Sequence, residues 1–163
     1  MDTHEITLHY CVIPYYKDEN LFRWSLGYLI SLIEETPFNH VWLSIKCNDN
    51  EAICVDLSGY ENTSKEYKKL KEYYSILNEL KIELSKEEYE ISILKINELK
   101  NVKYSFLKLI MLLINRKFKT KLLYNEYNST STEIIARILK ATNENYYIND
   151  PQLCGLKELK ALL

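Results

Sequence analysis

Two alternating apolar runs separated by a short polar cluster constrain the fold more than any other part of this sequence. The first run is HVWLSI at residues 40–45, the break is Asn48-Asp49-Asn50, and the second run is AICVDL at residues 52–57. Alternation with a period of two predicts strands, and the polar cluster between them predicts a β-hairpin turn. With a loop of three residues, residue 42 lies opposite residue 56, so that Asp56 is diagonal to His40 on the same face. A register shift of one residue would place these two side chains on opposite faces.

The rest of the chain predicts helices and further strands around this hairpin. Residues 6–12 alternate and then meet Pro14, which predicts a strand, and residues 26–33 have helical spacing and stop before Thr36-Pro37. We then expect a helix at 63–84 with an exposed Lys- and Glu-rich face, a strand at 89–96, a hydrophobic helix at 104–114, a helix opened by Ser131 and a short helix from Gly155. This order predicts one α+β domain over residues 1–163, with a small antiparallel sheet packed against helices.

The segment Thr130-Ser131-Thr132-Glu133 predicts a helix start that carries a hydroxyl. Thr130 and Glu133 have the spacing of a capping box, in which the hydroxyl and the carboxylate each accept a backbone N–H. Ser131 is then the first helical residue, and it shares a face with the apolar residues at 134, 135, 138 and 139. The Ser131 side chain is therefore expected to point inward, where it needs a partner.

His40, Asp56 and Ser131 are the candidate catalytic residues, because a hydroxyl, an imidazole and a carboxylate can form a triad. Each also has a structural alternative. A histidine at a strand start can serve the fold, Asp56 can cap a turn at Ser58-Gly59, and serine is favoured at helix starts in any case. His4 and His9 have no partner spacing, and we expect no role for them.

Charge and composition exclude several functional classes. The net charge of −2 provides no basic field for nucleic acid or anionic lipid. Three glycines give no phosphate-binding loop, and no cluster of His, Cys and carboxylate residues has metal-ligand spacing. We therefore expect no nucleic-acid partner, no cofactor and no metal. The 14 tyrosines are of a type that protein interfaces favour, so a protein partner stays open.

The four cysteines and the apolar segments indicate the compartment. Cys11, Cys47, Cys54 and Cys154 show no C-x-x-C spacing and are predicted to be free, buried thiols. The start of the sequence lacks the order of a secretory signal, and no window reaches about 18 consecutive apolar residues. These features predict no membrane span and a reducing, cytoplasmic location.

Four short motifs occur in an order that carries a family resemblance. They are Phe38-Asn39-His40-Val41, the strand pair ending in Val55-Asp56, the Tyr104-Ser105-Phe106 helix start, and the run from Thr130 to Arg137 before Pro151. Over residues 5–160 the chain resembles the circularly permuted papain-like thiol hydrolases of the NlpC type, in their YiiX-like branch, with lecithin-retinol acyltransferases as more distant relatives. In these families the histidine strand precedes the nucleophile helix. The resemblance implies that His40 is the general base, that Asp56 orients it, and that Tyr104 lines the substrate cleft.

Ser131 stands where the family has its catalytic cysteine. A helix N-terminus stabilises a thiolate, whereas a hydroxyl is not ionised near neutral pH and needs a site built for its deprotonation. The resemblance implies a cysteine peptidase or amidase for an amide or peptide-like bond, written here with serine through engineering or natural loss of activity. Two alternatives stay open: an inactive binding module that uses the cleft or the expected helix at 63–84, which is also rich in tyrosine, and an acyltransferase. The expected substrate is a peptide, an isopeptide or an acyl group.

Overall fold

A computed structural model describes residues 4–13, 21–46, 52–56, 64–120, 128–143, 148 and 150–162. The strands are β1 (His4–Val12), β2 (His40–Lys46), β3 (Ala52–Val55), β4 (Ser75–Leu84), β5 (Lys103–Tyr104) and β6 (Asn128–Ser129). The helices are α1 (Leu21–Glu34), α2 (Ser64–Tyr73), α3 (Lys86–Leu99), α4 (Phe106–Phe118), α5 (Ser131–Thr142) and α6 (Leu156–Lys160), with a 3-10 turn at Pro151–Leu153. The predicted α+β class is confirmed.

Four strands form an antiparallel sheet in the order β3-β2-β1-β4. In the hairpin, Leu43 pairs with Val55 and Ile45 pairs with Ile53. Continued by one residue, this register puts residue 42 opposite residue 56, which is the predicted pairing. The predicted turn at residues 48–50 lies outside the described residues.

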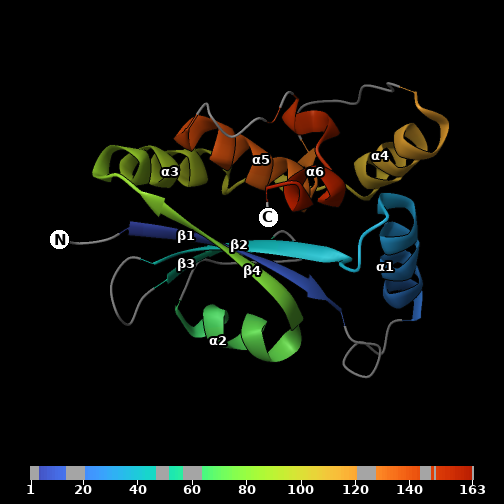
Figure 1. Cartoon of the computed structure of the whole chain (residues 1–163), viewed down its shortest axis with the longest axis horizontal. Helices are drawn as coiled ribbons and strands as arrows, with labels where there is room; N and C mark the ends of the chain where they lie inside the picture. Colours follow the sequence, from blue (N-terminus) through green and yellow to red (C-terminus); the bar gives the residue numbers. More distant parts are fainter. Residues whose placement is uncertain are drawn as a thin grey trace.

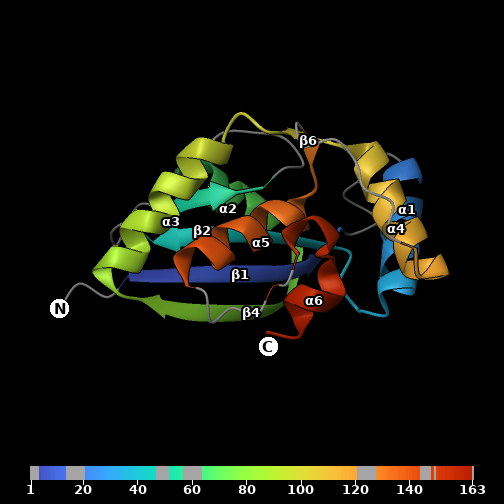
Figure 2. The ribbon, with the colours of Figure 1, turned by 90° about the horizontal axis from the view of Figure 1, so that it is seen from above.

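The two faces of the sheet carry different layers. Figure 1 shows α3, α5 and α6 on one side and α2 on the other, and Figures 1 and 2 show α1 and α4 together at one end. The main core lies under α3, α5 and α6, where Leu8 and Leu43 of the sheet pack with Ile134 and Leu139 of α5. A smaller cluster lies under α2 and contains Cys11, Trp42, Cys54 and Tyr74. Val41, Leu43 and Ile45 belong to the main core, so the alternation of residues 40–45 places His40, Trp42 and Ser44 on the opposite face of the sheet.

The predicted helix at 63–84 is wrong in its second half. The helix α2 ends at Tyr73, and residues 75–84 form the edge strand β4, in which Leu80 pairs with Leu8 and Ile82 with Ile6. The apolar spacing at 77 and 80 fits a helix, but the buried Ile82 and Leu84 alternate with exposed Lys81 and Glu83. The sequence of this segment is compatible with a helix and with a strand, and pairing with β1 makes it a strand.

The predicted strand at 89–96 is also wrong, because these residues lie inside α3. Ser85 caps this helix: its side chain accepts a hydrogen bond from the Glu88 N–H, and Glu88 accepts one from the Ser85 N–H. The buried Ser92, Ile96 and Leu99 follow at helical spacing. The capping-box spacing of Ser85 and Glu88 was the sequence signal for this helix.

Other predictions from the sequence are confirmed. Cys11, Cys54 and Cys154 are free and buried, while Cys47 lies outside the described residues. The α1 helix stops at Glu34 and Glu35 adopts a left-handed conformation with φ of 53° before Thr36-Pro37. In the described ranges no helix combines the length and apolar character needed to cross a bilayer.

Candidate active site

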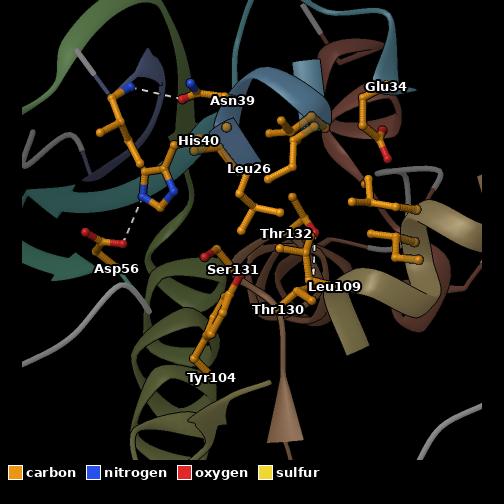
Figure 3. A pocket seen from close by; sticks show the side chains of 18 of the residues that line it. Leu26, Glu34, Asn39, His40, Asp56, Tyr104, Leu109, Thr130, Ser131 and Thr132 are labelled. Carbon is orange, nitrogen blue, oxygen red and sulfur yellow. Dashed lines mark hydrogen bonds and ion pairs between the residues drawn. The ribbon is translucent and has the colours of Figure 1, made fainter. Parts of the chain in front are cut away.

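One cavity of about 640 Å³ contains all four site residues expected from the sequence: His40, Asp56, Tyr104 and Ser131. His40 begins β2, Asp56 follows β3, Tyr104 ends β5 and Ser131 opens α5. Figure 3 shows the four side chains gathered at one end of the cavity. Residues that are far apart in the sequence therefore share one surface.

His40 and Asp56 form a direct imidazole–carboxylate pair. The Nε2 atom of His40 lies 3.0 Å from Oδ1 of Asp56, and the two side chains are 10% and 7% exposed. A carboxylate only accepts hydrogen bonds, so Nε2 carries the proton and donates it. In the neutral ring this leaves the lone pair on Nδ1, which is the atom that a general base uses.

Tyr74 holds this pair from the α2 side of the sheet. Its hydroxyl donates a 2.9 Å hydrogen bond to Oδ2 of Asp56, and its ring stacks on His40 with centroids 4.6 Å apart. Tyr74 is buried, at 3% exposed, and it also lines the cavity. The spacing of apolar residues predicts only that Tyr74 belongs to an amphipathic helix, because no local pattern indicates a contact with a hairpin.

Ser131 lies where two helices begin side by side. The short strands β5 and β6 run parallel, and the Ser105 N–H donates to the Ser129 carbonyl at 2.8 Å. Ser105 caps α4 and Thr130 caps α5, each accepting a hydrogen bond from the backbone N–H three residues later. Two positive helix ends therefore lie close to residue 131, an environment that favours negative charge.

No hydrogen bond joins Ser131 to His40 in the described part of the chain. Ser131 is partly buried and lines the cavity, and the helix face below it is buried as predicted, with Ile134 and Ile135 each 1% exposed. The structure thus brings the hydroxyl into the same cavity as the imidazole without a direct bond between them.

The predicted capping box at this helix is only half formed. Thr130 Oγ1 accepts from the Glu133 N–H at 3.3 Å, but the Glu133 carboxylate does not return to the Thr130 backbone. It lies instead 2.7 Å from Lys108 Nζ and 2.7 Å from the Arg137 guanidinium. Glu133 is fully buried, so two cations compensate its charge better than one amide would. This contact fixes α4 against the start of α5.

A second histidine network, which sequence analysis missed, lies under α2. Nε2 of His9 lies 2.8 Å from Ser44 Oγ, Nδ1 lies 2.7 Å from Glu79 Oε1, and the ring stacks on Trp42. His9 is thus not without partners, contrary to expectation, and His4 likewise stacks on Tyr89. The sequence held no signal for the His9 network, because its partners lie on two other strands.

Burial keeps the imidazole of His9 neutral near pH 7. Burial lowers the pKa of His9 to about 4, more than Glu79 opposes. The ring is 1% exposed, and none of the network's three hydrogen-bonded residues lines the cavity. A Ser-His-Glu arrangement without access for a substrate supports the sheet rather than chemistry.

Neither a metal cluster nor a known relative identifies the site. Within the described ranges no group of three or more His, Cys, Asp or Glu residues is placed to hold a metal ion. In comparisons with known proteins, no family model, no curated protein and no solved structure matches this chain.

Proposed function

We propose that the cavity is the active centre of a permuted papain-like hydrolase for an amide or peptide-like bond, with residue 131 at the nucleophile position. The observation that carries the proposal is that His40, hydrogen-bonded to Asp56, shares one cavity with the first residue of α5. The histidine precedes the nucleophile helix in the sequence, which is the permuted order. A histidine held by a carboxylate and a nucleophile at a helix start are the parts that acyl transfer requires.

Each group has a role in the proposed reaction. With cysteine at residue 131, the sulfur attacks the carbonyl carbon while its proton moves to Nδ1 of His40. That proton then passes to the amine nitrogen as the C–N bond breaks, and water cleaves the acyl–sulfur bond in a second step. The Glu133 N–H donates to the Thr130 cap, but the N–H groups of Ser131 and Thr132 in the same turn have no carbonyl partner within the helix and are suited to stabilise the oxyanion. Asp56 and Tyr74 fix the imidazole ring.

A second function follows from the serine itself. Ser131 makes no hydrogen bond to His40 within the described residues, and a hydroxyl gains little from a helix N-terminus near neutral pH. The chain as written is therefore suited to bind a ligand in the cavity without cleaving it. Both proposals use the same cavity, and they differ in whether residue 131 can attack.

The substitution Ser131→Cys tests the site directly. We expect the new thiol to react with iodoacetamide at pH 7 at least about tenfold faster than an ordinary exposed cysteine, because the helix ends and His40 stabilise the thiolate. His40→Ala in the same variant should remove most of this rate. The unchanged chain supplies the background, since Cys11, Cys54 and Cys154 are buried and burial raises the pKa of Cys154 to about 12.

A matched control separates the helix from the histidine. Ser85 is exposed and caps α3, so Ser85→Cys places a thiol at a helix start that lies outside the cavity. If the Ser131→Cys thiol reacted no faster than the Ser85→Cys thiol and ignored the loss of His40, the proposed active centre would be wrong. A rate that depends on His40 only in the Ser131→Cys variant supports it.

A further inference from the structure

Glu34 is a buried carboxylate at the end of the cavity opposite to His40. It is the last residue of α1, is 1% exposed, and lines the cavity. Figure 3 shows its carboxylate on the far side of the cavity from Asp56, with Leu26, Leu109 and Thr132 between them. The walls between the two ends are mainly aliphatic, formed by Leu26, Ile30, Leu109, Leu112 and Leu113.

One oxygen of this carboxylate is not satisfied by the protein. Oε2 accepts a hydrogen bond from the Lys157 N–H at 3.0 Å, whereas Oε1 is buried without a hydrogen-bond partner in the part of the chain that the structure describes. Among the described residues, Arg116 forms an ion contact with Glu34: its Nε lies 3.6 Å from Oε1 and, like Oε1, is buried without a hydrogen-bond partner there. An ion contact at this distance is too long for a hydrogen bond, which needs about 3.2 Å or less, so the hydrogen-bonding capacity of Oε1 stays unused.

The charges around Glu34 do not balance. Arg116 also donates to the Glu158 carboxylate and to the Leu153 carbonyl, so one guanidinium serves two carboxylates. Lys157 directs its ammonium group to Glu35 instead. Among the described residues that line the cavity there is no lysine or arginine. A buried negative charge in this position is costly unless a cation or a donor reaches it.

Gly155 brings the carboxylate into this position. A Cβ atom on Gly155 would lie 2.5 Å from Oε1 and 2.6 Å from Oε2 of Glu34, so only glycine allows such close approach. Gly155 and Leu156 line the same end of the cavity. The start of α6 and the end of α1 thus hold the carboxylate at the end of an apolar chamber.

We propose that Glu34 is a specificity residue that binds a primary ammonium group at the end of an aliphatic segment of the ligand. The aliphatic walls accept the chain, and Oε1 accepts an N–H bond from the charged end. The volume of about 640 Å³ falls within the range of small-ligand sites, which is about 300–1,000 Å³. This ligand is a substrate only if the proposed hydrolase is correct, and the reacting bond then lies at the His40 end of the cavity. The substrate class is then an amide that carries an aliphatic chain with a terminal amine.

Three probes of equal chain length test this binding without any chemistry. Titration calorimetry on the unchanged chain compares 1-octylamine, 1-octanol and octanoate, each below its aggregation concentration. We expect octylamine to bind at least about tenfold more tightly than octanol, since hydrogen bonds to charged groups are the strong ones. Octanoate should bind most weakly, because its carboxylate would meet Glu34 and the described lining offers no lysine or arginine to bind it. Equal affinity for the amine and the alcohol would overturn the inference and leave Oε1 to a bridging water.

A pair of variants tests whether the preference for the amine depends on Glu34. Glu34→Gln should abolish the preference for the amine. Glu158→Gln removes the other carboxylate on Arg116, a side chain that does not itself line the cavity, keeps an oxygen that can accept the Gly155 N–H, and should retain the preference. If Glu158→Gln lowered the preference as much as Glu34→Gln, the general charge of the cluster and not Glu34 would be responsible. Should Glu34→Gln fail to fold, the comparison of the three probes on the unchanged chain decides alone.

The two proposals fail separately. Amine preference in a protein whose Ser131→Cys variant shows no His40-dependent reactivity would overturn the hydrolase and retain Glu34 as the ligand-binding residue of a binding module. Reactivity that depends on His40 without any amine preference would support the hydrolase and overturn the role of Glu34.

Discussion

Tyr74 and His40 share the Asp56 carboxylate, each bound to a different oxygen. The Tyr74 hydroxyl donates to Oδ2 at 2.9 Å and His40 Nε2 lies 3.0 Å from Oδ1. The stacked rings of Tyr74 and His40 close the arrangement. A helix end on one side of the sheet therefore controls the orientation of an imidazole at the cavity.

Removing the Tyr74 hydroxyl should weaken the protein measurably. We expect Tyr74→Phe to lower the free energy of unfolding by about 1.5–3 kcal/mol, because the lost hydrogen bond goes to a charged group. Tyr74→Leu should cost more, since the stacked ring is lost as well. Urea denaturation measures both. Tyr28→Phe, on a side chain that is 63% exposed, serves as the control and should change stability by less than about 0.5 kcal/mol. Equal effects at both positions would contradict the assigned contact.

The stability of the protein should fall as the pH is lowered from about 6.5 to about 4. Burial lowers the pKa of His9 from 6.5 to about 4, so in this range the unfolded chain binds a proton that the folded chain does not. Contributions from Lys71 and Lys81 act in the same direction as burial, and Glu79 opposes them. The full effect amounts to roughly 3 kcal/mol. Below about pH 4 the His9 contribution no longer changes.

Denaturation at several pH values checks this expectation. His9→Gln should flatten the dependence of the unfolding free energy between pH 6.5 and 5. His4→Gln provides the control, because His4 is only partly buried and stacks on Tyr89. If the pH dependence persisted in His9→Gln and vanished in His4→Gln, the assignment of the effect to His9 would be wrong.

The buried ion cluster at the start of α5 should respond unequally to the loss of its members. Glu133→Gln leaves Lys108, with a side chain 6% exposed, without its carboxylate, and we expect a loss of about 3–5 kcal/mol. Lys108→Met should cost less because Arg137 still compensates Glu133. The exposed pair of Lys95 and Glu98 offers the comparison, where Glu98→Gln should cost under about 1 kcal/mol. A larger loss in Lys108→Met than in Glu133→Gln would refute this order.

Gly27 should not tolerate alanine, although it lies inside a helix. Alanine in a helix gains about 0.5–1 kcal/mol over glycine. Here, however, a Cβ would lie 2.7 Å from Asn39 Nδ2 and 3.2 Å from its Cγ. Asn39 is held in turn by the Ile13 N–H, which donates to its Oδ1 at 3.0 Å. We expect Gly27→Ala to lower stability by about 1–3 kcal/mol through this overlap.

The same alanine should become favourable once Asn39 is shortened. In an Asn39→Ala background, Gly27→Ala should raise the unfolding free energy by the helix gain of about 0.5–1 kcal/mol. Thermal denaturation of the four proteins of this cycle gives the sign directly. If Gly27→Ala had the same effect in both backgrounds, the overlap with Asn39 would not be its cause.

Local patterns predicted the parts of the site that depend on local geometry. The hairpin register that pairs Leu43 with Val55 follows from a short loop between two alternating runs, and it places Asp56 beside His40. The start of α5 at Ser131 follows from its cap. In each case neighbours in the sequence determine the structure.

Contacts between segments that are distant in the sequence could not be predicted from local patterns. Residues 75–84 have apolar positions compatible with a helix or a strand, and only pairing with β1 makes them β4. Tyr74 and Glu34 join the cavity because α2 and α1 pack where they do. No periodicity encodes the distance between an oxygen on one helix and a guanidinium on another, so the sequence did not indicate that Glu34 lines the cavity. The α3 helix differs, since its capping box was visible and outweighs the alternation that suggested a strand.

The parallel pairing of β5 with β6 joins two segments of the second half of the chain, and both follow His40 and Asp56 in the sequence. During synthesis His40 and Asp56 leave the ribosome well before residue 131. Tyr104 and Ser105 cannot form their contacts with Ser129 until that later segment has been made. The cavity therefore stays incomplete, and its imidazole faces no residue 131, until α5 docks on the sheet. A protein cleaved between α4 and β6 would hold His40 and Ser131 on separate polypeptides, and the two pieces would have to fold together to rebuild the cavity.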